Sequence, residues 1–150
     1  MTALERAEIQ PGVVVQLDVD ALSRSGRSRT NAERTEQDDR AVVGEHSFLV
    51  LKLDDTRETA FATPLFSAWA PGSEQLNESL KSGHPGKWIG VVLHFNRWQH
   101  WEIALDELVA KSQVEDTEVG SRRRYAADAP AELARILSFA DRNRAPWRDT

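Results

Sequence analysis

The sequence predicts a small domain of mainly antiparallel β-strands, bent into a barrel, with a helix near the C-terminus. Short β-branched runs follow one another along the first two thirds of the chain. No helical pattern separates the first three runs, which excludes a doubly wound parallel sheet. One amphipathic helical pattern stands near the end, and 150 residues suit a single domain. Together these observations favour a mainly β fold with some α: an antiparallel β-barrel over about residues 11–104 and a helix after it.

The first half of the chain predicts three strands. A β-branched run after a Pro-Gly breaker makes residues 12–19 the first strand. Residues 20–41 contain almost no large apolar side chains, so we expect a long, mobile, basic loop there. Strands at 47–53 and 58–66 follow, joined by a short polar turn as in a hairpin. Pro64 has no N–H to donate, so the third strand should lie at an edge at that point or end there.

The stretch HFNRWQHWE, residues 94–102, lies where the fourth and fifth strands are expected, at 88–95 and 98–103. The two residues between those strands, 96–97, have the spacing of a tight hairpin turn, and asparagine tolerates the positive φ that such turns need. In this hairpin His94 and His100 would face opposite sides and could not hold one metal ion. A packing role for the aromatic cluster is therefore favoured over a catalytic one.

Two helices are predicted in the last third of the chain. A short helix is expected over 103–111, after the fifth strand. The longer helix is expected over 129–143, where Asp128 is a suitable N-cap and Pro130 falls in the first turn. Its apolar residues recur at helical spacing, at positions Leu133, Ile136, Leu137 and Ala140.

Composition excludes several classes of function. The chain has no cysteine, which removes disulfides, thiolate nucleophiles and cysteine-based metal centres. No apolar run approaches the roughly 20 residues that span a bilayer, and the N-terminus lacks a signal-peptide pattern, so we expect a cytoplasmic protein without a membrane partner. A formal net charge of −5 argues mildly against a protein coated in nucleic acid. No phosphate-binding glycine motif and no convincing acidic cluster is present, so neither a cofactor nor a metal is expected.

Four features follow one another over about residues 11–70: a Gly-opened strand ending in VQLDVD, a polar and basic loop, the strand HSFLVLKL, and a strand ending in ATPLFS. In this arrangement the segment resembles the MazF/PemK-like toxin endoribonucleases. The resemblance implies an SH3-like barrel, a homodimer, and metal-independent cleavage of single-stranded RNA. It also implies an antitoxin partner whose tail wraps the toxin.

The family's site residues carry over only in part. In the family a basic residue, usually arginine before proline, opens the second strand, whereas this chain has His46 there and Arg40 a few residues earlier. The family's Thr or Ser that follows a proline at the end of the third strand corresponds to Ser67, after Pro64. The departure at His46 leaves open an altered site, an inactive one, or a related barrel with another function.

The residue types fit RNA cleavage without reference to the family. A histidine can act as acid or base near neutral pH. An arginine offers a fixed fork to phosphate oxygens, and a serine hydroxyl can donate to a developing oxyanion. We therefore predict Arg40, His46 and Ser67 as catalytic residues. The same residues also fit structural roles, as a solvated arginine, a strand cap and a turn residue.

The predicted binding residues lie mainly in the basic loop. Arg24, Arg27, Arg29 and Arg34 alternate with small residues, a composition that suits contacts with an RNA backbone. The alternative for these arginines is a solvated, flexible loop. Trp69 is a candidate platform for stacking a base, although tryptophans near strand ends more often belong to a core or its rim.

The competing function is a non-catalytic SH3-like interaction module that binds a peptide or protein through an aromatic groove. The His46 departure and the negative net charge favour the module. The basic loop and the Pro-x-x-Ser strand end favour the nuclease. A third reading is a DNA-associated barrel from a phage or plasmid.

Overall fold

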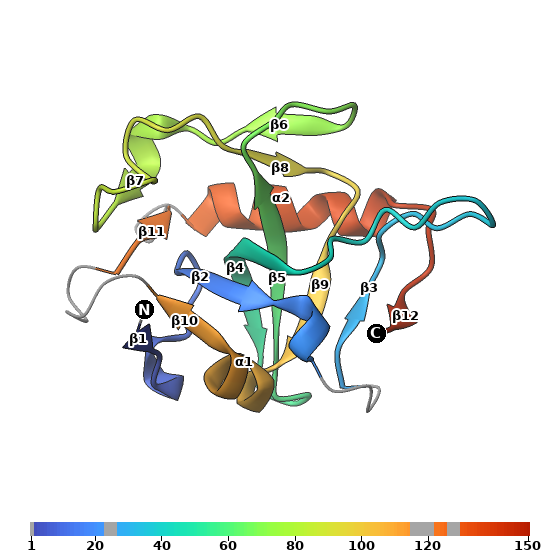
Figure 1. The fold of residues 1–150 in the computed structure, drawn as a ribbon, viewed down its shortest axis with the longest axis horizontal. Helices are drawn as coiled ribbons and strands as arrows, with labels where there is room; N and C mark the ends of the chain where they lie inside the picture. The colour runs from blue at the N-terminus through green and yellow to red at the C-terminus, as the bar shows by residue number, and fades with distance from the viewer. Residues whose placement is uncertain (1, 23–26, 115–121, 126–129) are drawn as a thin grey trace.

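The computed structural model describes residues 2–22, 27–114, 122–125 and 130–150 (Figure 1). It confirms a mainly antiparallel β fold with a C-terminal helix. The helices are α1 (Leu105–Lys111) and α2 (Pro130–Arg142), with 3-10 turns η1 (Arg6–Glu8), η2 (Val19–Ala21) and η3 (Glu78–Leu80). The strands are β1 (Thr2–Ala3), β2 (Val14–Asp18), β3 (Arg29–Thr30), β4 (Glu45–Asp54), β5 (Thr59–Phe66), β6 (Ser73–Gln75), β7 (Lys81–Ser82), β8 (His94–Asn96), β9 (Trp101–Ala104), β10 (Ser112–Val114), β11 (Arg124–Tyr125) and β12 (Arg148–Asp149).

The main sheet follows the order β1-β10-β2-β4-β5-β9-β3-β12, and neighbouring strands in this order are antiparallel. Strands β2, β4 and β5 confirm the first three predicted strands, and α1 and α2 confirm the two predicted helices. Asp128, the predicted N-cap of α2, lies outside the described residues. Among the described residues β1 and β12 are not paired with each other, so closure into a barrel stays a prediction.

The predicted hairpin over 88–103 is wrong. Strands β8 and β9 do not pair with each other; both pair with β5, through Phe95 opposite Leu65 and Trp101 opposite Ala62. The chain therefore runs along β5 in one direction, with an irregular stretch at 97–100. This interruption lies opposite the part of β5 that contains Pro64. Because proline has no N–H to donate, the expected loss of pairing occurs on the side of β5 that faces β8 and β9. The strand does not end at Pro64 but continues to Phe66.

The first part of that predicted hairpin is a turn. Residues 86–90 form turns in which Gly90 has a φ of 78°. The Trp88 side chain is buried in the core, where its Nε1 donates a 2.9 Å hydrogen bond to the Ser82 carbonyl. A strand with one buried face would bury alternate residues of this run. Here Trp88 is buried, whereas Val92, four residues later, is exposed. The apolar run has the composition of a strand but not its conformation.

The segment 20–41 is packed in part. Strand β3 pairs with β9 on one side and β12 on the other. Thr30 and Asn31 are buried and bind the His100 backbone, with Thr30 Oγ1 donating to the carbonyl at 2.8 Å and Asn31 Oδ1 accepting from the N–H at 2.7 Å. The predicted loop is wrong for Arg29–Thr30, which form a strand, while residues 28, 31 and 32 have no regular structure but are buried. Polar side chains hold this stretch to the sheet because large apolar side chains are missing there. Residues 23–26 of the predicted loop lie outside the described residues, and mobility over 20–41 stays a prediction.

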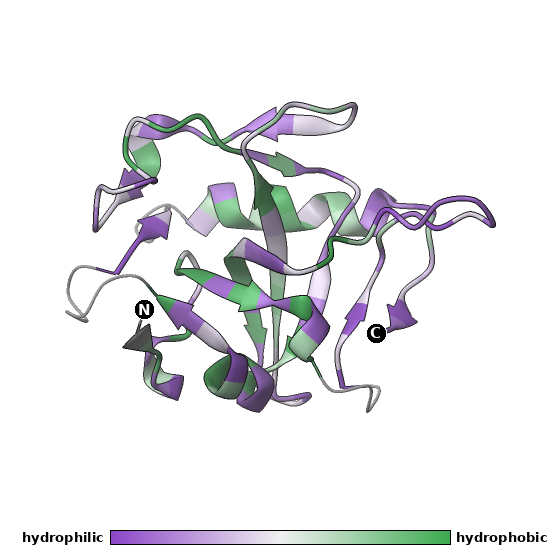
Figure 2. Ribbon diagram, in the orientation of Figure 1, coloured by the Kyte–Doolittle hydropathy of each residue, from purple (hydrophilic) through white to green (hydrophobic). Residues whose placement is uncertain are grey.

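Both faces of the central strand β4 are buried. On one face Phe48 and Val50 belong to an apolar cluster that includes Leu108 of α1. On the other face Leu49 belongs to a cluster that includes Ile136 of α2, the helix that runs across the central strands in Figure 1. Figure 2 shows apolar residues gathered on these elements and a hydrophilic loop projecting between β3 and β4. Polar side chains are therefore free for function mainly at strand ends and in the loops.

Candidate functional site

The three predicted catalytic residues, Arg40, His46 and Ser67, line one open cleft of about 820 Å³. We call it the β4–β5 cleft. It lies at the end of the β4–β5 hairpin away from the turn, because the start of β4 and the end of β5 meet there in an antiparallel pair. Its other polar and aromatic lining residues include Gln16, Glu33, Glu45, Ser47, Phe66, Ser73, Asn96, Trp98 and Gln99.

His46 is placed by sheet register. It lies opposite Leu17 of β2, and its ring meets the Phe66 ring edge-on with centroids 5.6 Å apart. The His46 side chain is half-buried, and Ser67 is exposed immediately after Phe66. The adjacent Ser47 hydroxyl accepts a 2.5 Å hydrogen bond from Gln16 Nε2. The cleft therefore presents the His46 imidazole near the start of β4 and the exposed Ser67 hydroxyl just after the end of β5.

The Arg40 backbone is held by Gln99, which is not among the site residues predicted from the sequence. The Gln99 amide is buried; its Nε2 donates to the Arg40 carbonyl at 2.9 Å, and its Oε1 accepts from Val42 N at 2.9 Å and Trp101 Nε1 at 3.0 Å. This side chain ties the loop before β4 to the start of β9. The signal available in the sequence was a lone glutamine among the aromatic residues of HFNRWQHWE, where a buried amide needs partners.

The electrostatics of the β4–β5 cleft are mixed. Arg40 is the one arginine or lysine among its described lining residues, and Arg40 Nε pairs with Asp38 Oδ2 at 2.8 Å. Two carboxylates, Glu33 and Glu45, line the same cleft. Both groups of the Arg40–Asp38 pair are mostly exposed, so a ligand phosphate can compete for the guanidinium.

The arginines predicted to bind RNA are not gathered at this cleft. Arg27 pairs with Asp106 at 2.8 Å, and Arg29 pairs with Glu102 at 2.6 Å. Arg34 lies 3.9 Å from Asp39, and Arg24 lies outside the described residues. The Arg27 guanidinium lowers the pKa of Asp106 by a hydrogen bond. Arg29 is paired with a buried carboxylate, which weakens its case as a phosphate ligand. Arg27 and Asp106 are both about half exposed, so Arg27 can exchange this partner for a phosphate.

Trp69, the predicted stacking residue, is 67% exposed on the segment after β5 but does not line the β4–β5 cleft. Trp98 does line it, next to Gln99. The sequence pattern predicts that Trp98, as part of the aromatic cluster at 94–102, packs in a hairpin. Because that hairpin is absent, its indole is left at the surface, 38% exposed.

Glu102 forms a second polar centre, which is structural. Its carboxylate is buried and accepts from Arg29 Nε at 2.6 Å, Arg57 Nε at 2.7 Å and Thr59 Oγ1 at 2.7 Å. Burial raises the pKa of Glu102, but these hydrogen bonds outweigh it and lower the pKa overall. The Arg29 guanidinium also lies 5.0 Å from the Trp147 ring. With all its partners inside the protein, this cluster joins β3, β5 and β9 and offers no open position for a substrate.

Within the part of the chain that the structure describes, no three histidine, aspartate or glutamate side chains are grouped so as to hold a metal ion. No helix among these residues is long and apolar enough to cross a membrane. Comparisons with protein-family models, with curated proteins and with solved structures each found no match.

Proposed function

We propose that the protein is a cytoplasmic, metal-independent endoribonuclease of the toxin–antitoxin kind that cuts single-stranded RNA. The observation that carries the proposal is the convergence of Arg40, His46 and Ser67 on the β4–β5 cleft. They come from a loop, the start of one strand and the end of another, so their shared cleft is not a consequence of sequence proximity. A homodimer and an antitoxin partner belong to the same proposal and rest on the family resemblance.

The three side chains supply distinct parts of the reaction. His46 removes the proton from the ribose 2′-hydroxyl, whose oxygen then bonds to phosphorus while the bond from phosphorus to the 5′-oxygen breaks. Arg40 binds the non-bridging phosphate oxygens, and the Ser67 hydroxyl donates to the charge that develops on them. The leaving 5′-oxygen takes a proton from solvent. The products are a 2′,3′-cyclic phosphate and a 5′-hydroxyl.

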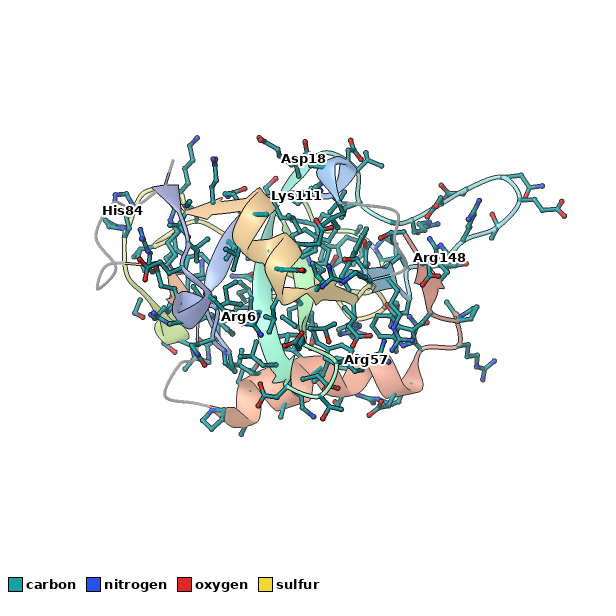
Figure 3. All side chains as sticks on the ribbon, turned by 90° about the horizontal axis from the view of Figure 1, so that it is seen from below. Arg6, Asp18, Arg57, His84, Lys111 and Arg148 are labelled. Carbon is teal, nitrogen blue, oxygen red and sulfur yellow. The ribbon has the colours of Figure 1, made fainter. Side chains whose placement is uncertain are left out.

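The test is cleavage of a labelled single-stranded RNA by the purified protein in EDTA. The His46→Ala variant should cleave more slowly by about 10²–10⁴-fold, the usual contribution of one acid–base group. His84→Ala is the matched control, because this histidine lies in a loop outside the cleft (Figure 3) and its loss should leave the rate unchanged. Equal rates for wild type and His46→Ala would refute the assignment of the base.

A second candidate is a non-catalytic interaction module. It is favoured by the two carboxylates, Glu33 and Glu45, which line the cleft together with Phe66 and Trp98. Acidic side chains beside aromatic rings suit a basic peptide better than an anionic RNA. If the wild type cleaves no RNA, binding of lysine- and arginine-containing peptides that weakens in Glu33→Gln and Glu45→Gln would establish this alternative.

A further inference from the structure

A second cleft, of about 500 Å³, adjoins the first and shares Glu33 and Trp98 with it. We call it the arginine cleft. It is formed by the stretch after β3 and by the chain that leaves α2 for β12, and its remaining lining residues are Ala32, Arg34, Asn143, Arg144, Ala145, Pro146 and Arg148. None of the residues after position 142 was singled out in the sequence as a binding residue.

The charge of the arginine cleft is the opposite of that of its neighbour. Three arginines and one glutamate line it, whereas the β4–β5 cleft is lined by one arginine and two glutamates. Arg144 is exposed and has no ion-pair or hydrogen-bond partner among the described residues. Its guanidinium is therefore available to an anion without breaking an existing contact.

The other two arginines are partly committed. Arg148 Nη2 pairs with Asp39 Oδ1 at 2.6 Å, and its Nη1 donates to the Ala32 carbonyl. These contacts fix Arg148 in place on the wall of the cleft. Arg34 lies 3.9 Å from Asp39, and both groups are about half exposed, so this pair contributes little and is easily exchanged for a phosphate.

Trp98 stands at the junction of the two clefts. Its backbone is held on both sides, since its N–H donates to Asn96 Oδ1 at 2.9 Å and its carbonyl accepts from Asn143 Nδ2 at 2.9 Å. Its indole packs edge-on against Phe139 of α2, with centroids 5.9 Å apart, yet stays 38% exposed. A fixed and partly exposed indole is a surface on which a base can stack.

We propose that the arginine cleft binds the phosphodiester backbone of single-stranded RNA next to the β4–β5 cleft, with one base stacked on Trp98. Guanidinium groups in an open cleft suit phosphates, and an aromatic ring beside them suits an unpaired base rather than a duplex. The position of this cleft beside a scissile bond rests on the proposed function. Recognition of RNA by the cleft itself does not.

The test is fluorescence anisotropy with a labelled, single-stranded 2′-O-methyl RNA, which cannot be cleaved because its 2′-oxygens are blocked. Arg144→Ala should lower the slope of log affinity against log salt by about 0.7, the value for one lost contact with a single strand. If wild type and variant bind equally at 1 M salt, this change in slope corresponds to about fourfold weaker binding by the variant at 0.15 M salt. Arg6→Ala is the matched control, because Arg6 is also exposed but lies far from Arg148 (Figure 3).

Trp98 variants test the stacking part. Trp98→Ala should weaken binding by about 5- to 150-fold, which corresponds to stacking of about 1–3 kcal/mol per base. Trp98→Phe should recover most of this loss, because a phenyl ring still stacks, and melting temperatures identify any variant that has merely lost its fold. Equal recovery by Trp98→Leu would show that packing, not stacking, is responsible, and would overturn the stacking assignment.

The outcomes separate the two proposals. Wild-type binding that depends on Arg144 and Trp98, without cleavage of unmodified RNA, refutes the nuclease and leaves the arginine cleft as an RNA-binding site. Cleavage together with unchanged binding and salt slope in Arg144→Ala refutes the arginine cleft and leaves the nuclease. Failure of the wild type to bind RNA at all overturns the cleft proposal directly.

Discussion

Replacement of Gln99 by leucine tests the physical basis of the β4–β5 cleft. Gln99 is 5% exposed, and its amide makes three hydrogen bonds, to the Arg40 carbonyl, the Val42 N–H and the Trp101 indole N–H. Leucine has a similar size but neither donates nor accepts. The substitution therefore removes all three bonds while changing the packing volume little.

The cost follows from the groups that lose a partner. The bonds from Val42 N and Trp101 Nε1 are buried, and a buried donor left without an acceptor costs about 1–3 kcal/mol. The Arg40 carbonyl is only partly buried, so water from the cleft can replace the amide there. Burial of leucine offsets part of the loss. We expect Gln99→Leu to lower the free energy of unfolding by about 2–5 kcal/mol.

The assay is urea denaturation followed by tryptophan fluorescence, with linear extrapolation to water. Gln37→Leu is the matched control, because this glutamine is exposed and no hydrogen bond of its side chain is seen among the described residues. It should stay within about 0.5 kcal/mol of the wild type, as surface substitutions usually do. A Gln99→Leu protein as stable as the control would show that the amide does not hold the loop before β4.

Three further predictions concern stability. Burial lowers the pKa of His100 below its ordinary 6.5, so the unfolded chain binds a proton on this histidine more readily than the folded protein. The free energy of unfolding is therefore unaffected above pH 6.5 and falls as pH drops below it, by at most about 1.4 kcal/mol per pH unit. Urea midpoints at pH 7.5 and 5.5 should therefore differ less in His100→Gln than in the wild type; an unchanged difference contradicts the assignment. Glu102→Gln should cost about 1.5–3 kcal/mol, because the amide keeps only one acceptor oxygen and one of the charged hydrogen bonds to Arg29 and Arg57 is lost. Exposed Glu36→Gln should be nearly neutral in the same titration. Gly83→Ala should lower the melting temperature more than Gly90→Ala. Both glycines have positive φ, but only at Gly83 would a Cβ overlap the Arg122 carbonyl. Equal losses of melting temperature in the two variants would exclude that overlap as the cause.

The sequence by itself determined the elements whose patterns are local. Strands β2, β4 and β5 and helices α1 and α2 were predicted because their apolar residues repeat at strand or helix spacing and because breakers mark their ends. Pro64 also marked the interruption beside β5, since a missing N–H is a property of the residue itself. The residue types of Arg40, His46 and Ser67 suggested a site, but nothing local showed that they share one cleft.

The tertiary structure decided what depends on distant partners. The run at 88–103 satisfies a hairpin pattern, yet β8 and β9 pair with β5 because strand pairing is settled by contacts across the whole sheet. Arg29 pairs with Glu102, which is 73 residues away in the chain, so no local pattern could tell a phosphate ligand from a structural cation. The same holds for Trp98 and Arg144, whose shared cleft exists only because the chain after α2 returns beside β3. The chemical type of each side chain is known from the sequence, but whether that side chain contacts solvent, a carboxylate or a ligand depends on the residues that the fold brings next to it.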